Sequence, residues 1–236
     1  MNAPNGHQVD MQLYLIRHAE SENNAKPAHQ RSEDPAITDV GQLQAAHLAD
    51  WLKTVNFDEL ITSPVLRALQ TTRHIIDATG QHVRVWSDVF EEGGIYPGYG
   101  HQATKGAAGL RRSDVIRQVA ANSDSYTLDD EIVESGWWGG RDRETPEQAS
   151  ERAKSVKRRL IQSFGGSGKS VVAVIHADFK RKLLVEILGG KVDPREFGNL
   201  CNTGITKLTL EGDRCQLQWF NSVSHLPAKL ITGNET

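Results

Sequence analysis

Two short runs of apolar residues, at positions 13–16 and 171–175, have the length and composition of strands that are buried on both faces of a sheet. The first run continues directly into Arg17-His18, and the second ends at His176. In open α/β sheets the carboxyl ends of parallel strands open onto the ligand crevice. The pattern therefore predicts that two histidines lie together at the edge of a sheet where ligands bind.

Signals for strands and helices alternate along most of the chain. This alternation favours an α/β fold built of βα units with a mostly parallel central sheet. The expected elements, apart from the two runs above, are short strands at 59–62 and 83–86, helices that begin at Thr38, at Ser63-Pro64 (with Gly80 as its stop) and at the capping box Thr145-Pro146-Glu147-Gln148, and a closing hairpin with its turn at 211–213.

The alternation breaks down between Gly93 and Gly140, where glycines cluster and only residues 113–121 have the pattern of a helix. Long irregular segments inside a compact domain commonly form lids or binding loops. We therefore predict a single domain over residues 11–236 with a cap inserted at about 93–140. Residues 1–10 are polar, and we expect them to be a disordered N-terminal tail.

Two pairs of residues stand out in this segment, and the sequence leaves two roles open for each. Trp137 and Trp138 either wall a ligand pocket or anchor the segment on the core, since tryptophan is largely buried wherever it lies. Arg111 and Arg112 either bind a second anionic group of a substrate or form a solvated basic pair beside the start of a helix.

Composition excludes some classes of partner. A net charge of −3 gives no electrostatic footprint for nucleic acid or for an anionic membrane. No apolar run approaches the ~18 residues of a membrane helix, and the N-terminal residues contain no signal core. Cys201 falls outside the register of the hairpin that carries Cys215, so we expect two free thiols in a reducing compartment. These features predict a soluble cytoplasmic protein.

The pair Arg17-His18 is the first indication of chemistry. A guanidinium is a planar, permanently charged donor that suits a phosphate, whereas it repels a metal ion from a neighbouring imidazole. A single histidine is more often a surface or structural residue, and this chain has nine. The position of His18 and His176 at strand ends distinguishes them from the others.

Four motifs follow one another between about Met11 and Leu226. In this combination the chain resembles the histidine phosphatase superfamily, in its phosphoglycerate mutase-like branch. The resemblance implies a three-layer α/β/α sandwich and a reaction through a phosphohistidine that needs neither a metal nor another cofactor. The motifs are Arg17-His18-Ala19-Glu20-Ser21 followed by Asn24, then Ser63-Pro64 followed by Arg67-Ala68 and Gln70-Thr71, then Glu91 after a strand, then a strand that ends in His176.

The resemblance also implies roles for single residues. His18 would be the nucleophile that takes the phosphoryl group. Arg17, Arg67 and His176 would surround the phosphoryl oxygens. Glu91 would be the general acid that protonates the leaving oxygen, with the adjacent Glu92 as the alternative.

Further positions of the resemblance concern substrate binding and the backbone. Ser21 and Asn24 match positions that contact the phosphate or its substituent, with loop-stabilising hydrogen bonds as the alternative role. Ala177 belongs to the same expected substrate-binding set. The family usually has glycine after each histidine, whereas this chain has Ala19 and Ala177, which restrict the backbone more than glycine does.

The function that we expect is a phosphomonoesterase acting on a small phosphorylated metabolite. The alternatives are a mutase, which returns the phosphoryl group to a second hydroxyl of the substrate, and a non-catalytic module that binds a phosphorylated ligand. The segment Glu91-Glu92-Gly93-Gly94-Ile95-Tyr96 departs from the Glu-Arg-His-Tyr-Gly segment usual in the family's cofactor-dependent mutases, which favours the phosphatase. The sequence names no substrate and leaves the oligomeric state open, a homodimer included.

Overall fold

Seven strands form one sheet at the centre of the structure, a computed structural model that describes residues 11–97, 104–120, 124–212 and 214–233. They are β1 (Met11–Arg17), β2 (Glu59–Thr62), β3 (Val83–Val85), β4 (Tyr126–Leu128), β5 (Ser170–Ile175), β6 (Ile205–Glu211) and β7 (Arg214–Ser222). Their order is β4-β3-β2-β5-β1-β6-β7. The pairings from β4 to β1 are parallel, whereas β6 and β7 pair antiparallel. The tail expected at residues 1–10 lies outside the described residues.

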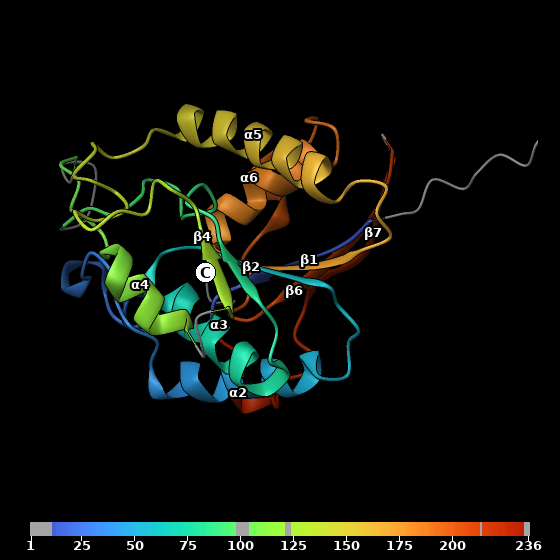
Figure 1. Cartoon of the computed structure of the whole chain (residues 1–236), viewed down its shortest axis with the longest axis horizontal. Helices are drawn as coiled ribbons and strands as arrows, with labels where there is room; N and C mark the ends of the chain where they lie inside the picture. Colours follow the sequence, from blue (N-terminus) through green and yellow to red (C-terminus); the bar gives the residue numbers. More distant parts are fainter. Residues whose placement is uncertain (1–10, 98–103, 121–123, 213, 234–236) are drawn as a thin grey trace, which may run out of the picture.

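Helices cover both faces of this sheet (Figure 1). The helices on one face are α2 (Asp39–Leu52), α3 (Leu66–Thr79) and α4 (Arg112–Val119), and those on the other are α5 (Pro146–Phe164) and α6 (Ala177–Ile187). A short helix, α1 (Glu22–Ala25), follows β1. The expected three-layer α/β/α arrangement with a mostly parallel sheet is confirmed.

Strand β1, which lies inside the sheet between β5 and β6, shows how the sequence builds two cores. Successive side chains of a strand point to opposite faces. Leu13 and Leu15 accordingly pack into the core under α5 and α6, whereas Tyr14 and Ile16 pack into the core under α2, α3 and α4. A strand with apolar neighbours on both faces has a continuous apolar sequence, which is the pattern that identified β1 and β5.

The helix starts agree with the capping residues except at α3. Thr38 caps α2 by accepting from the Gly41 N–H at 3.0 Å, and Thr145 caps α5 in a capping box with Gln148. The start predicted at Ser63-Pro64 is wrong, because α3 begins at Leu66. The Ser63 hydroxyl is engaged elsewhere, and the N–H of Leu66 is capped by a carboxylate from a distant loop, Asp34 Oδ1 at 3.0 Å. The predicted stop at Gly80 is confirmed by its left-handed φ of 70°.

The segment 93–140 has more structure than its sequence pattern predicts. It contains α4, close to the predicted helix, and it also supplies β4, which was missed because three residues carry too little periodicity. Trp137 and Trp138 are buried against Phe90, with ring centroids 5.4 and 5.0 Å apart. Both rings therefore anchor the segment on the core, and Trp138 also lines a cavity beside Phe90 and Arg141.

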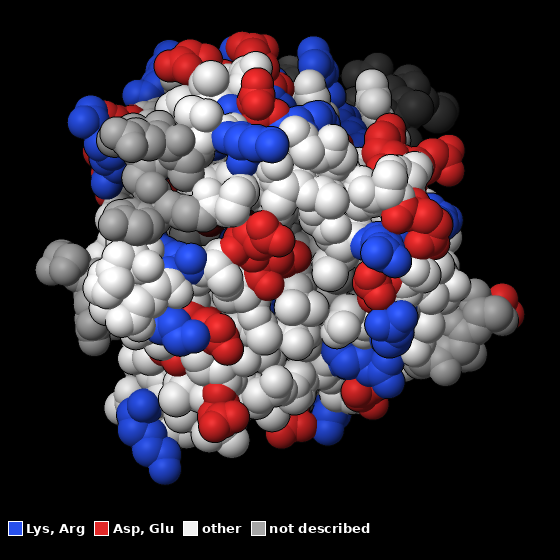
Figure 2. Space-filling model, turned by 90° about the vertical axis from the view of Figure 1, so that its left-hand side faces the viewer, with Lys and Arg blue, Asp and Glu red and all other residues white. Residues whose placement is uncertain are grey.

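Surface and cysteine features agree with the composition. On the face that carries the segment 93–140, basic and acidic side chains are interspersed (Figure 2). Cys201 is buried and Cys215 is partly exposed on β7, and both are free thiols. Among the described residues, the helices are too short or too polar to span a bilayer.

Candidate active site

His18 lies directly after β1 and is held in one orientation. Its Nδ1 lies 2.7 Å from the carbonyl oxygen of Ala19, and because a carbonyl only accepts, the proton is on Nδ1. The lone pair is then on Nε2, which accepts from Nε of Arg67 at 3.0 Å. Burial, together with the charges of Arg67 and Arg17, holds the pKa of His18 well below its ordinary value. The ring is therefore neutral at physiological pH, with Nε2 unprotonated.

His176 reaches the same place from the neighbouring strand. The parallel pairing of β1 with β5 sets Arg17 opposite Ile175, so that the next residue of each strand lies side by side. The imidazole centroids of His18 and His176 are 5.1 Å apart. The prediction that the two strand ends bring these histidines together is confirmed.

One nitrogen of His176 has no partner. Its Nε2 lies 2.9 Å from the hydroxyl of Ser63, whose oxygen already accepts from the Val65 N–H, so the hydroxyl hydrogen is available to Nε2. When this hydroxyl donates to Nε2, the ring proton lies on Nδ1, which is buried without a hydrogen-bond partner among the described residues. A buried donor that lacks an acceptor beside His18 is suited to an oxygen of a bound anion.

Two arginines add positive charge next to this histidine pair. Arg17 is buried, and burial lowers its pKa to about 10. Its Nη1 donates to the carbonyl of Leu200, whereas its Nε has no partner in the described part of the chain. Arg67 lies in the first turn of α3, as predicted. Neither is among the arginines that form ion pairs within the described ranges. Two cations with no carboxylate in ion-pair contact are suited to binding an anion.

Glu91 brings a carboxylate to the N-terminus of α6. Its Oε1 accepts from the backbone N–H groups of Phe179 and Glu92, both at 2.9 Å. Burial raises the pKa of Glu91 to about 7, with a further contribution from the negative charge of Asp178. A carboxyl with this pKa both donates and accepts a proton near neutral pH.

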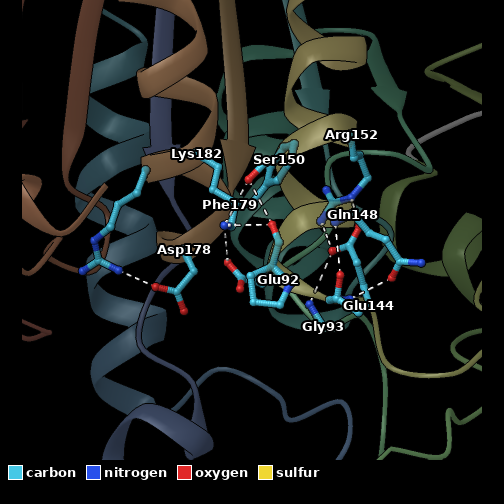
Figure 3. A network of polar contacts seen from close by, with 12 residues as sticks. Glu92, Gly93, Glu144, Gln148, Ser150, Arg152, Asp178, Phe179 and Lys182 are labelled. Atoms are coloured by element: carbon cyan, nitrogen blue, oxygen red, sulfur yellow. Dashed lines mark hydrogen bonds and ion pairs between the residues drawn. The ribbon is translucent and has the colours of Figure 1, made fainter. Parts of the chain in front are cut away.

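The loop that follows Glu91 contacts both α5 and α6 through polar side chains (Figure 3). Glu92 forms an ion pair with Lys182 at 3.4 Å, and Lys182 also donates to the hydroxyl of Ser150. On the other side Arg152 pairs with Glu144 at 2.6 Å. The two adjacent glutamates therefore differ: Glu92 is engaged in a structural ion pair, whereas Glu91 is not.

The expected substrate-binding residues fall at the same cavity but have structural contacts. The hydroxyl and the N–H of Ser21 both donate to Oδ1 of Asn24, at 3.0 and 3.1 Å, which is the loop-stabilising alternative. Ala177 is the first residue of α6. Positive φ among the described non-glycine residues is confined to Thr203 and Asn221, so Ala19 and Ala177 sit in backbone conformations that alanine tolerates.

Several residues of the site were missed by sequence reasoning. Asn202 donates to the carbonyl of His18 at 3.2 Å, and Thr203, with φ 54°, donates its N–H to the carbonyl of Arg17 at 3.1 Å. Gly233 lines the cavity, and a Cβ there would lie 2.4 Å from Nη1 of Arg17. These contacts join segments about 200 residues apart, and no local sequence signal announces them.

The arginine pair of the segment 93–140 does not reach this cavity. Arg111 is exposed at the start of α4, and Arg112 donates to the carbonyl of Ile132 at 3.0 Å. A second-anion role for this pair is therefore wrong, because both side chains lie outside the lining. Arg143 lines the cavity instead, with its guanidinium 4.3 Å from the ring centroid of Tyr96.

The cavity beside His18 has a volume of about 620 Å³, a size that suits a small ligand. The predicted site residues Arg17, His18, Ser21, Asn24, Arg67, Glu91 and Ala177 all line it. His176 lies behind this lining and is fully buried. Within the described ranges, no group of three His, Cys, Asp or Glu side chains is arranged to hold a metal ion.

The sequence profile of the Histidine phosphatase superfamily (branch 1) matches residues 13–223, and this chain belongs to that family. It is 26% identical over 214 residues to a putative phosphoserine phosphatase 2 of Hydrogenobacter thermophilus, covering 90% of this chain and 96% of that protein. It is 25% identical to a 2,3-bisphosphoglycerate-dependent phosphoglycerate mutase of Cytophaga hutchinsonii, covering 91% and 92%.

Solved structures share the fold. A phosphoserine phosphatase of Entamoeba histolytica in complex with phosphoserine superposes with a TM-score of 0.61 at 23% identity, covering 92% of this chain and all of that one. Bacillus stearothermophilus YhfR superposes with a TM-score of 0.65 at 18% identity, covering 91% and 98%. The chain is thus a histidine phosphatase superfamily enzyme whose relatives include both phosphatases and mutases.

Proposed function

We propose that this enzyme is a metal-independent phosphatase that hydrolyses a small phosphorylated metabolite through a phosphohistidine on His18. The observation that carries the proposal is the state of the His18 ring. The Ala19 carbonyl holds the proton on Nδ1 and leaves the lone pair on Nε2, in a pocket with two cations that have no ion-paired carboxylate among the described residues. A neutral imidazole beside uncompensated positive charge is what attack on an anionic phosphoester requires.

In the first half of the reaction, Nε2 of His18 attacks phosphorus and the bond to the leaving oxygen breaks. The protonated Glu91 carboxyl gives its proton to that oxygen, so that an alcohol leaves instead of an alkoxide. Arg17, Arg67 and Nδ1 of His176 donate to the phosphoryl oxygens as charge redistributes over them. The Ala19 carbonyl stabilises the positive charge on the phosphorylated ring through the Nδ1 proton.

In the second half, water takes the place of the alcohol. The Glu91 carboxylate removes a proton from this water while its oxygen bonds to phosphorus and the bond from phosphorus to Nε2 breaks. Inorganic phosphate leaves, the His18 ring is again neutral, and Glu91 is again protonated. A pKa of about 7 lets one carboxyl group serve in both directions.

The loop after Glu91 favours a phosphatase over a mutase. Residues 91–96 lack the basic and aromatic pattern of the mutase segment, and Glu92 occupies the next position in an ion pair with Lys182. Because Glu92 stands where the mutase segment has arginine, this position offers no cation to a second phosphoryl group, which a mutase must hold while the substrate turns. The similarity to a mutase of Cytophaga hutchinsonii makes mutase activity the outcome to test against.

The test is phosphate release from a panel of phosphorylated metabolites in the presence of a metal chelator. Wild type is compared with His18→Ala and with His74→Ala, a histidine on the outer part of α3, as a matched control. We expect turnover that survives the chelator, is lost in His18→Ala and is retained in His74→Ala. Faster interconversion of 3- and 2-phosphoglycerate than hydrolysis would identify a mutase. Ligand binding without any turnover in wild type would identify a binding module.

A further inference from the structure

Asp34 is a partly buried residue whose carboxylate the proposed reaction does not use. It lies in the loop between α1 and α2, and its Oδ1 accepts from the N–H of Leu66 at 3.0 Å. The first turn of α3, which carries Arg67, therefore rests on a carboxylate from another part of the chain. The second oxygen, Oδ2, is buried and has no hydrogen-bond partner among the described residues.

A carboxylate oxygen without a partner in the interior is costly unless another state of the molecule uses it. The charged groups that act on Asp34 are Arg67, which attracts it, and Glu33, which repels it. Burial outweighs both and raises the pKa of Asp34 to about 6. Of the charges that act on Arg67, that of Asp34 comes first, ahead of Glu91. Arg67 is thus the cation whose charge acts on Asp34, and Asp34 is tied through its Oδ1 to Leu66, the residue directly before Arg67.

Arg67 itself must change partners during the reaction. In the structure its Nε donates to Nε2 of His18, so the lone pair that would attack phosphorus is occupied. Attack requires this contact to break. A guanidinium has five N–H donors in a planar fork, so one edge can bind a phosphoryl group while another is held by a carboxylate.

We propose that Asp34 is a positioning residue whose Oδ2 accepts a hydrogen bond from Arg67 when a phosphoryl group displaces Arg67 from His18. The inference rests on the proposed function in one respect, namely that Arg67 binds the phosphoryl group. Asp34 contacts neither the substrate nor the reacting atoms. It fixes the guanidinium from behind and, through Oδ1, ties that position to the start of α3.

The first test compares wild type with Asp34→Asn from pH 5 to pH 8. Asparagine keeps an oxygen that can cap Leu66, and it removes the charge and the second acceptor. The ratio of the two kcat/KM values cancels the titration of Glu91, which both proteins share. We expect a ratio near one at pH 5, where Asp34 is protonated in wild type, rising to roughly 10- to 100-fold at pH 8, as for the loss of a charge-assisted hydrogen bond. A ratio that is constant with pH would overturn the inference and leave Asp34 a helix cap only.

A matched control separates this role from capping. Asp58 also accepts from a backbone N–H, that of Ser170 at 2.8 Å, at the start of β5 and away from the cavity. We expect Asp58→Asn to give a kcat/KM ratio to wild type that does not change with pH. We further expect the effect of Asp34→Asn to disappear in an Arg67→Lys background, because an ammonium has no second edge to present.

The second test measures binding of inorganic phosphate by calorimetry at pH 8, without turnover. Asp34→Asn should weaken this binding by a factor similar to its effect on kcat/KM. If wild type binds phosphate but hydrolyses no substrate, and the variant still binds more weakly, the proposed function fails while the role of Asp34 stands. If the variant binds phosphate as wild type does, the role of Asp34 is disproved whatever the activity.

Discussion

Two groups of arginines in this molecule differ in how their charge is balanced. On α5, Arg152 pairs with Glu144 at 2.6 Å, and Arg159 pairs with Asp129 at 2.6 Å and Asp88 at 3.0 Å. At the ends of β1 and the start of α3, the other group has buried donors and no carboxylate in ion-pair contact among the described residues. The charges of the first group are balanced by the carboxylates of its ion pairs. The second group has no such partner among the described residues, so an anionic ligand would balance its charge.

Each group lines its own cavity, and the cavity that we propose as the active site is the smaller of the two. The cavity beside Arg152 and Arg159 has a volume of about 1010 Å³, against about 620 Å³ beside His18. Burying a cation without a partner costs several kcal/mol (~3–5). Such a cost is tolerated where a ligand removes it. We therefore base the proposed site on the charge balance of the lining and not on the volume of the cavity.

Arg67 gives the largest expected effect. Arg67→Ala removes a donor to the transferring group, and we expect kcat/KM to fall about 10³-fold. The melting temperature should change little, because no ion pair is broken. Arg67→Lys keeps the positive charge but not the planar fork of donors. Its kcat/KM should lie between that of wild type and that of Arg67→Ala. Retention of more than a tenth of wild-type kcat/KM in Arg67→Ala would show that this arginine is not part of the anion site.

A substitution at Gly233 tests whether the close approach of this glycine keeps Arg17 in position, since Arg17 has no ion-paired carboxylate among the described residues. A Cβ at position 233 would lie 2.4 Å from Nη1 of Arg17, and φ is +81°. Gly233→Ala should displace Arg17 and lower kcat/KM by roughly 10²-fold. Gly80→Ala is the matched control, since Gly80 has φ +70° and open space around it. Both variants carry backbone strain of about 1 kcal/mol, and only the first should lose activity. Equal activity of the two would remove Gly233 from the site.

Arg159 should show the opposite behaviour. Arg159→Met leaves Asp129 and Asp88 without their cation, and we expect the free energy of unfolding in urea to fall by about 1–2 kcal/mol, since the pair is about a third exposed. As a control, Arg158→Met replaces the neighbouring exposed arginine. This variant should change the free energy of unfolding by less than about 0.5 kcal/mol. The kcat/KM of both folded variants should remain within twofold of wild type. A large loss of activity in Arg159→Met would show that the ion-paired arginines also take part in the reaction, and the two groups would then not differ in function.

The sequence predicted what depends on local pattern. Continuous apolar runs identified β1 and β5, and parallel pairing then placed His18 beside His176. Prediction from the sequence failed where a residue far away in the chain determines the local structure. The start of α3 is set by a carboxylate 32 residues earlier, and β4 exists only because β3 offers an edge. Asn202 and Gly233 join the site through contacts that no spacing encodes.

The comparison also extends to the carboxylates, through their pKa values. For Asp129, burial is outweighed by its hydrogen bonds with Arg159, so its pKa lies below the ordinary value. For Glu91, burial and the charge of Asp178 raise the pKa to about 7. Because the proposed reaction uses the protonated form of Glu91 as the acid of its first step, kcat/KM, which reports the free enzyme, should fall as pH rises through about 7.

Removing the negative charge of Asp178 beside Glu91 should move this fall of kcat/KM to lower pH. Asp178→Asn takes away negative charge that favours protonated Glu91, so the pKa of Glu91 should decrease and the midpoint of the fall should move to lower pH. Asp129→Asn should leave the midpoint unchanged, because its carboxylate belongs to the balanced group. The measurement is kcat/KM from pH 5 to pH 9 for the three proteins. A midpoint that stays fixed in Asp178→Asn would mean that a group other than Glu91 supplies the proton.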